Sequence, residues 1–113
     1  MASDVQITLP VLKVLRVMID APLRQQYGLQ LMHGAGLKSG TLYPVLARLE
    51  RAGWIDGEWE QEPHRGRPPR KFYKLSEDGM ALARTALAEA ATALSPMPVR
   101  KQRRAPRLGE RFA

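Results

Sequence analysis

Five basic side chains lie close together in the second half of the chain, where they could bind an anion. No Asp or Glu occurs between residues 63 and 74, and the cations there are Arg65, Arg67, Arg70, Lys71 and Lys74. Guanidinium and ammonium groups donate charge-assisted hydrogen bonds to phosphate oxygens. A solvated surface is the alternative use of such a cluster. Five cations without an acid nevertheless favour an anionic partner, with nucleic acid as the first candidate.

The composition limits the other chemistry that this chain can perform. The 113 residues contain no Cys and only two His, so disulfides, thiol catalysis and a zinc ribbon are excluded and no metal or cofactor is expected. No nucleophile elbow or phosphate-binding loop frames the Ser, His and carboxylate residues, so we assign no catalytic residue and expect no enzyme. The length predicts one domain. Without a long apolar run or a secretory pattern, a cytoplasmic protein without a membrane partner is expected.

The net charge of +7, from 18 Lys and Arg against 11 Asp and Glu, is unevenly distributed. Residues 1–94 hold 12 basic and 10 acidic residues, whereas residues 95–113 hold six and one, together with three prolines. A segment with so few large apolar residues cannot offset the entropy of ordering, so 95–113 is predicted to be a disordered basic tail. Such a tail could serve solubility or could contact DNA phosphates.

Apolar residues at helical spacing predict three helices before the basic cluster, at about 9–19, 24–33 and 40–52. Ser39 is the expected N-cap of the third helix. A glycine inside a helix costs about 1 kcal/mol relative to Ala, which suggests that another backbone packs closely against Gly28 in the second helix.

A hairpin is predicted to follow the third helix. Residues 54–61 alternate as a half-buried strand, and residues 72–75 are its partner. The side chains expected to face inward are Ile55, Trp59, Tyr73 and Leu75. The proline-rich connection is too long for a tight turn, so it projects the basic cluster as a loop, which we call the wing (residues 63–71).

Ser76 is expected to cap a last helix over residues 77–94. Its apolar seam has alternating spacings of three and four residues and consists of Met80, Ala83, Leu87, Ala90 and Leu94. A fold of about 90 ordered residues buries only some 60 to 65% of its unfolded surface, so an exposed seam is costly. We therefore expect dimerisation through this seam and regard a ligand pocket as the less favoured use.

The order of these elements is typical of a winged helix-turn-helix protein. We predict a mainly α fold with a small β-hairpin, in which a winged helix-turn-helix is followed by one C-terminal dimerisation helix. The three expected parts are the DNA-binding domain (1–76), the dimerisation helix (77–94) and the tail (95–113). In such a fold the recognition helix, here about 40–52, enters the major groove, while the wing contacts phosphates or the minor groove.

The sequence also resembles the PadR family of bacterial transcriptional regulators. The resemblance covers about residues 9–94 and rests on Tyr-Gly-Leu-Gln-Leu at 27–31, Ser-Gly-Thr-Leu-Tyr-Pro-Val-Leu-Ala-Arg-Leu-Glu at 39–50, Gly-Trp-Ile at 53–55, Gly-Arg-Pro at 66–68 and Arg-Lys-Phe-Tyr-Lys-Leu at 70–75. It implies a homodimer that binds double-stranded DNA and usually represses, with the last helix building the dimer and often helping to form an effector pocket. The segment 22–27 is longer than the family spacing, and Pro69 is an extra residue in the wing.

The resemblance and the exposed side of the third helix together give one expected DNA-binding set. It consists of Ser39, Gly40, Thr41, Tyr43, Pro44, Arg48, Arg65, Gly66, Arg67, Arg70 and Lys71. Alternatives stay open for three members: Ser39 could act only as a cap, Tyr43 could only pack, and Arg48 could pair with an acid. A small-molecule effector is compatible with the family but is not identified by the sequence. A winged module that binds other proteins is the competing class, and the basic wing argues against it.

Overall fold

The computed structural model describes residues 3–22, 24–62 and 65–94 of the chain. The elements are α1 (Leu9–Asp20), β1 (Gln26–Tyr27), α2 (Gly28–Ala35), α3 (Ser39–Arg51), β2 (Ile55–Trp59), β3 (Lys71–Leu75) and α4 (Glu77–Leu94). The expected tail, 95–113, lies outside the described residues. Within the described part, no helix combines the length and the apolar character needed to cross a membrane.

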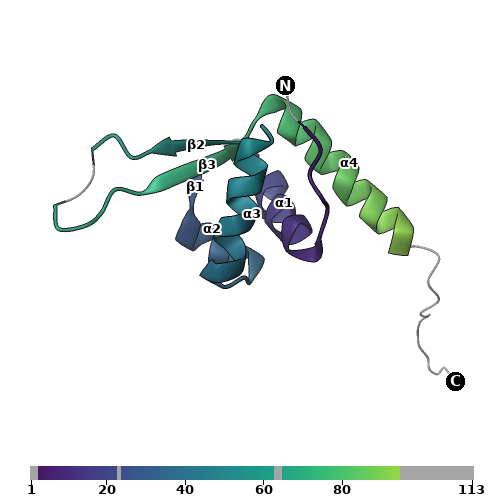
Figure 1. The fold of residues 1–113 in the computed structure, drawn as a ribbon, viewed down its shortest axis with the longest axis horizontal. Coiled ribbons are helices and arrows are strands. Elements are labelled where there is room, and N and C mark those ends of the chain that lie inside the picture. Colours follow the sequence, from purple (N-terminus) through teal and green to yellow (C-terminus); the bar gives the residue numbers. More distant parts are fainter. Residues whose placement is uncertain (1–2, 23, 63–64, 95–113) are drawn as a thin grey trace, which may run out of the picture.

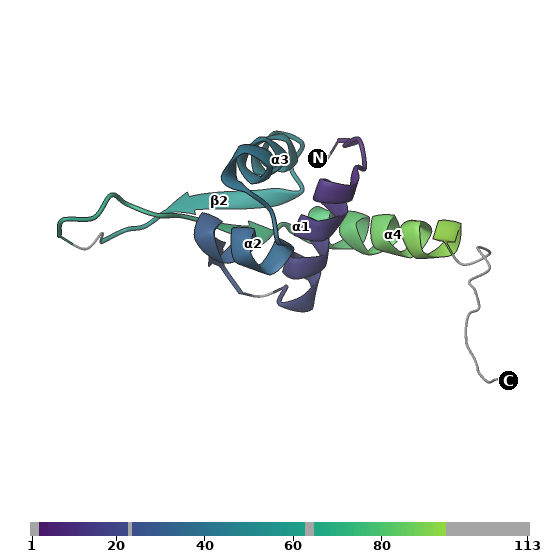
Figure 2. The same ribbon diagram turned by 90° about the horizontal axis from the view of Figure 1, so that it is seen from below.

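The three helices α1, α2 and α3 form the centre of the molecule (Figure 1). The β2–β3 hairpin extends from one side of this centre and α4 extends from the other, and a perpendicular view shows the same arrangement (Figure 2). The core is formed mainly by apolar residues of α1 and α3 and of the strand ends that adjoin them; its fully buried large side chains include Val11, Val14, Leu15, Leu31, Leu42, Leu46, Leu49 and Ile55.

The predicted fold class is confirmed, and three of the four helices begin and end within about one residue of the expected positions. The caps explain two of these starts. Thr8 Oγ1 accepts a hydrogen bond from the Val11 N–H (3.3 Å), and Ser76 Oγ accepts one from the Gly79 N–H (2.9 Å). These side chains satisfy backbone donors that have no partner inside the helix.

The predicted start of the second helix at residue 24 is wrong, because α2 begins at Gly28. The two residues before it form β1 instead, with Gln26 opposite Tyr73 and Tyr27 opposite Phe72 of β3. The sheet therefore has three antiparallel strands in the order β1-β3-β2. The Tyr27 N–H then donates to Gln30 Oε1 (3.0 Å), which closes the helix start. At the other end, Gly36 has a φ of 66°, a conformation that favours glycine.

The predicted cap at Ser39 is also wrong by one residue. Lys38 is the N-cap of α3, no side chain accepts a hydrogen bond from the helix start, and Ser39 is the first helical residue. Extended backbone at Lys38 (φ −79°, ψ 156°) makes the turn from Gly36 into α3 without help from a hydroxyl. The Ser39 side chain is exposed and remains available for other contacts.

The hairpin is buried toward its base and uncovered at its outer end. Ile55 of β2 lies opposite Leu75 of β3 and both are buried, whereas Trp59 lies opposite Lys71 and is 61% exposed. The inward direction predicted for Tyr73 and Leu75 is confirmed. Trp59 points to the same side of the sheet as Ile55, as predicted, but it is not covered, because the hairpin extends beyond the helices at that point.

α4 packs against α1, and this contact uses part of the seam that the sequence assigned to a dimer. Ala83 is completely buried within the chain, so no surface of it is left for a second copy, which corrects its expected role. Met80, Leu87 and Ala90 remain half-buried, and Leu87 packs against the core. The side chain of Leu94 lies outside the described set.

Gly79 is predicted to be a position where Ala destabilises a helix instead of stabilising it. A Cβ at Gly79 would overlap the carbonyl oxygen of Trp54, and backbone atoms cannot move aside cheaply. Gly79→Ala should therefore lower the free energy of unfolding by about 1–3 kcal/mol. Gly40→Ala is the matched control: its Cβ would meet no atom within 4 Å, and a gain of about 0.5 kcal/mol is expected. Urea unfolding of both variants measures this, and a Gly79→Ala protein as stable as the Gly40→Ala protein would contradict the packing described here.

Candidate nucleic-acid interface

The first turns of α3 present a polar surface because the opposite face of the helix is anchored in the core. The anchoring side chains are Leu42, Val45, Leu46 and Leu49, and all four are buried. On the outer side Ser39, Gly40, Thr41 and Pro44 are exposed. Pro44 is the sixth residue of α3 and has no N–H to donate to the Gly40 carbonyl, so the helix continues there with one hydrogen bond fewer.

Tyr43 both packs and stays exposed, so neither of its two expected uses excludes the other. Its side chain lies against Gly28 at the start of α2, and a Cβ on Gly28 would overlap the Tyr43 hydroxyl. The close neighbour that the sequence predicted at Gly28 is therefore this aromatic ring and not another backbone. Tyr43 is 47% exposed. Gly28 thus allows α2 to hold the ring while part of the ring faces outward.

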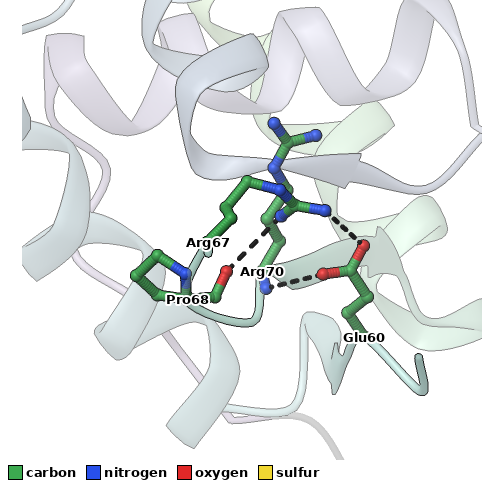
Figure 3. A network of polar contacts seen from close by, with 4 residues as sticks. All are labelled: Glu60, Arg67, Pro68 and Arg70. Carbon is green, nitrogen blue, oxygen red and sulfur yellow. Dashed lines mark hydrogen bonds and ion pairs between the residues drawn. The ribbon is translucent and has the colours of Figure 1, made fainter. Parts of the chain in front are cut away.

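Glu60 holds the base of the wing together. Its backbone N–H donates to the Arg70 carbonyl (2.7 Å), and its carboxylate accepts from the Arg67 guanidinium (3.1 Å) and from the Arg70 backbone N–H (3.3 Å). Figure 3 shows the two hydrogen bonds of the Glu60 carboxylate, and it shows the Arg70 side chain extending away from them. The hydrogen bond from Arg67 holds the pKa of Glu60 below its ordinary value, with a smaller contribution from the Arg70 N–H.

A second ion pair connects β3 with α3. Lys71 Nζ lies 2.9 Å from Glu50 Oε1, and this hydrogen bond raises the pKa of Lys71. The acid that could have paired with Arg48 is therefore engaged by Lys71. Both side chains are partly exposed, so the pair contributes about 1 kcal/mol at most. It is a direct contact between the outer part of the hairpin and the recognition helix.

The basic cluster is less uniform than the sequence suggested. Arg67 and Lys71 have acidic partners from other parts of the chain. Arg70 lies over the ring of Tyr27, with 4.2 Å from Cζ to the ring centroid, and within the described ranges its guanidinium forms no ion pair. Arg65 is exposed and likewise has no acidic partner among the described residues. Lys74 lies opposite Asp56 in the strand register.

The tip of α3 and the wing border one groove of about 590 Å³. Its lining residues come from β1, α2, α3, β2, β3 and the wing and are Tyr27, Gly28, Leu29, Tyr43, Trp59, Pro68, Pro69, Arg70, Lys71 and Tyr73. The structure thus brings Tyr43, Arg70 and Lys71 of the expected set together. Arg48 lies apart, beside the N-terminal segment near the other end of α3. Leu29 and Trp59 were not among the expected site residues, although each is a large exposed hydrophobic side chain.

The profile of the transcriptional regulator PadR-like family matches residues 14–85. The chain belongs to this family. PadR-family members are DNA-binding transcriptional regulators, and the matched span runs from α1 through the recognition helix and the hairpin into α4. Among the described residues no group of three or more His, Asp or Glu is placed to hold a metal ion.

Solved structures with the same fold include other PadR proteins. A PadR family regulator from Eggerthella lenta DSM 2243 is 28% identical, with 73% of this chain and 74% of that chain covered and a TM-score of 0.59. A PadR-like transcription factor from Bacteroides fragilis is 26% identical, with coverages of 77% and 86% and a TM-score of 0.58. The protein smu.1704 from Streptococcus mutans UA159, at 23% identity, coverages of 79% and 86% and a TM-score of 0.60, shares the fold. The comparison with curated proteins gives no significant match.

The contribution of Glu60 to stability should depend on pH. Its pKa is lower in the folded protein than its ordinary value of 4.5, so its stabilising effect is complete above that value and is lost as the pH falls through the folded-state pKa. Glu60→Gln should therefore lower the thermal midpoint at pH 7 and have a smaller effect at pH 3.

Glu62→Gln is the control for this prediction, because Glu62 is exposed and forms no ion pair with a described residue. Thermal unfolding of both variants across this pH range provides the measurement. If Glu60→Gln lowers the thermal midpoint by the same amount at pH 3 as at pH 7, the ion pair with Arg67 is not the source of the stabilisation.

Proposed function

We propose that this protein acts in the cytoplasm as a sequence-specific transcriptional regulator that binds an inverted-repeat operator as a homodimer and represses by occluding the promoter. One observation carries the proposal: the exposed tip of the recognition helix and the basic wing border the same groove, through Tyr43 on one side and Arg70 and Lys71 on the other. Two surfaces that share an edge can engage neighbouring parts of one duplex, whereas the family membership alone would not place them together.

In the proposed complex, α3 enters the major groove by its N-terminal turns. Ser39, Gly40 and Thr41 are exposed there, and Thr41 offers a hydroxyl and a methyl group to base edges. Because no side chain caps α3, the backbone N–H groups of Ser39 and Gly40 are available to a phosphate, whereas the Thr41 N–H already donates to the Lys38 carbonyl. Phosphate contacts fix the register of the protein, and the base contacts determine which sequence is bound.

The wing then contacts the adjacent phosphates or the minor groove. Arg65 and Arg70 have no acidic partner among the described residues and are the cations that gain most from a phosphate. Arg67 and Lys71 would exchange a carboxylate partner for a phosphate, so their contribution to the binding free energy is smaller. Gly66, with a φ of 75°, allows the turn that brings these side chains to the end of the hairpin.

The dimer is proposed to form through α4 and the adjoining surface of α1, which leaves 1–76 as the DNA-binding unit. Met80, Leu87 and Ala90 are only half-buried in a single chain. Leu87 also borders an open depression of about 400 Å³ with residues of α1 and α2, among them Leu12, Val17 and Ala35. A second copy of α4 laid into this depression would cover the remaining apolar surface. The resulting twofold axis would present two recognition helices to successive major grooves.

The affinity for duplex DNA should fall steeply with salt. About eight neutralised phosphates per dimer give a slope of roughly −7 in a plot of log affinity against log salt concentration. Changing Arg65 and Arg70 to Ala removes two contacts per chain, so the slope should weaken by about 3 to 4. Arg84→Ala, an exposed cation on α4, should leave the slope unchanged. Fluorescence anisotropy of a labelled duplex gives the affinity of all three proteins at each salt concentration. A double variant with the parental slope would refute the role of the wing.

Ala90→Asp should convert the dimer into a monomer. Ala90 lies in the last turns of α4, so a carboxylate there would be buried in the proposed dimer but can reach water in a single chain. Ala88→Asp is the matched control, because Ala88 is exposed on the other side of the same helix. Sedimentation equilibrium gives the mass of each, and an Ala90→Asp protein that stays dimeric would rule out this face as the interface.

A further inference from the structure

The groove between the recognition helix and the wing combines exposed aromatic rings with cations. We propose that it is a site for single-stranded DNA, in which unpaired bases stack on the rings. This goes beyond the proposed function, because the bases of a duplex are stacked on one another and offer only their edges to a protein. The partner is named as DNA because the chain belongs to a family of DNA-binding proteins.

Aromatic side chains form much of the lining. Four rings from four different elements border a space of about 590 Å³, namely Tyr27, Tyr43, Trp59 and Tyr73. This volume lies within the roughly 300–1,000 Å³ of sites for drug-sized groups, so it admits a base together with its sugar. Tyr43 is 47% exposed and Trp59 is 61% exposed. Unpaired bases stack on such rings whatever their sequence, because every base has a π-face.

The two faces of the hairpin differ in charge. Trp59 lies opposite Lys71 in the strand register and both line the groove, so this face is aromatic and basic. The acids on either side of Trp59 in the chain, Glu58 and Glu60, alternate with it and border a separate, smaller depression together with Phe72. No Asp or Glu lines the groove. A polyanionic strand is therefore favoured on the groove face.

Cations and rings lie next to one another in the groove. The Arg70 guanidinium lies over the Tyr27 ring at 4.2 Å and has no acidic partner among the described residues. Lys71 Nζ lies 5.7 Å from the centroid of the Trp59 ring and already has the Glu50 carboxylate as a partner. Arg70 is thus the cation that gains most from a phosphate. Cations that follow the backbone and rings that take the bases are the usual means of binding a single strand.

Two of the four rings have contacts within the chain that order them before any strand binds. The Tyr27 ring packs edge-on against Phe72, with 5.8 Å between the ring centroids. A Cβ at Gly28 would overlap the Tyr43 hydroxyl, so the Tyr43 ring lies close against the start of α2. Ordered rings lose less conformational entropy when a base covers them.

Other polyanions match the groove less well. An acidic peptide would satisfy the cations, but its carboxylates do not come with flat rings to cover Tyr43 and Trp59. A duplex supplies phosphates, but the faces of its bases are hidden in the stack until a base is flipped out. Single-stranded DNA supplies both phosphates and free base faces.

The first test compares two strands of equal charge at about 0.2 M salt. One is an oligothymidylate of about 12 residues, which forms no duplex with itself, and the other is an abasic strand of the same length. The other cations of the chain, including those of 95–113, attract the phosphates of both strands alike. Anisotropy of the labelled strands should show at least about tenfold tighter binding of the oligothymidylate, because only its bases can stack. Equal affinities would overturn the proposal.

Substitutions at Trp59 locate the bases. Trp59→Ala should weaken oligothymidylate binding about tenfold and leave the affinity for the abasic strand unchanged, whereas Trp59→Phe keeps a ring and should lose less. Leu9→Ala is the matched control, because Leu9 is 64% exposed and does not line the groove. A Trp59→Ala protein that binds oligothymidylate like the parent, or that loses affinity for both strands alike, would overturn the assignment.

Tryptophan fluorescence gives a second measure of the same contact. Trp54 is buried, so quenching on addition of oligothymidylate should come from Trp59 and should disappear in Trp59→Phe while anisotropy still reports binding. Saturable binding to the parent protein without quenching would place the bases elsewhere and overturn the proposal.

Duplex DNA separates this site from the proposed function. Trp59 lies outside the residues expected to bind a duplex, so Trp59→Ala should change duplex affinity by less than about twofold. An equal loss for duplex and single strand would assign Trp59 to the duplex interface and overturn the proposal, and tighter binding of a uridine strand would overturn DNA as the partner. Failure of the parent protein to bind any duplex would instead refute the proposed function, and the single-strand titrations would still decide what the groove binds.

Discussion

The hairpin and the recognition helix are fixed to one another at two levels, and every functional argument depends on this coupling. At the base, Ile55 and Leu75 are buried against the helices, where two large aliphatic side chains contribute several kcal/mol of hydrophobic stabilisation. Further out, where no core remains, the pair of Lys71 and Glu50 connects β3 to α3. Burial supplies most of the energy, and the ion pair adds a direct contact between α3 and the outer part of β3.

The acid beside the wing lowers its affinity for phosphate but orders part of its backbone. Glu60 engages Arg67 and the backbone of Arg70, so it reduces the positive charge available to a phosphate while it orders these two residues of the wing. A wing without this acid would carry more charge and would lose more conformational entropy on binding. The same acid holds the backbone at Arg70, whose guanidinium lies over the Tyr27 ring and has no acidic partner among the described residues.

Most of the fold could be predicted from the sequence because its elements depend on the local spacing of apolar residues. The stripe of Leu42, Val45, Leu46 and Leu49 has helical period, and Tyr73 and Leu75 have strand period, so helices and strand faces follow. β1 could not be predicted, since two residues show no period and their pairing depends on a strand far along the chain. This pairing is also the reason that α2 starts four residues later than expected.

The site was predicted less completely, because ion pairs depend on tertiary distances. The partners of Lys71 and Arg67 are 21 and 7 residues away in the sequence, and nothing local distinguishes Glu50 or Glu60 from other surface acids. Gly28 did give a signal, but its neighbour proved to be a side chain, Tyr43. Strand alternation gave the face of Trp59 correctly and could not show where the core ends.

The most direct test of the central claim is a map of backbone amide shifts by NMR as a duplex is added at low salt. Non-specific duplex suffices, because phosphate contacts supply most of such binding. The account predicts that amides around Thr41 in α3 and around Arg70 in the wing shift together, at the same DNA concentrations, while those around Arg84 in α4 do not. Shifts confined to α4, or to one of the two surfaces without the other, would contradict it.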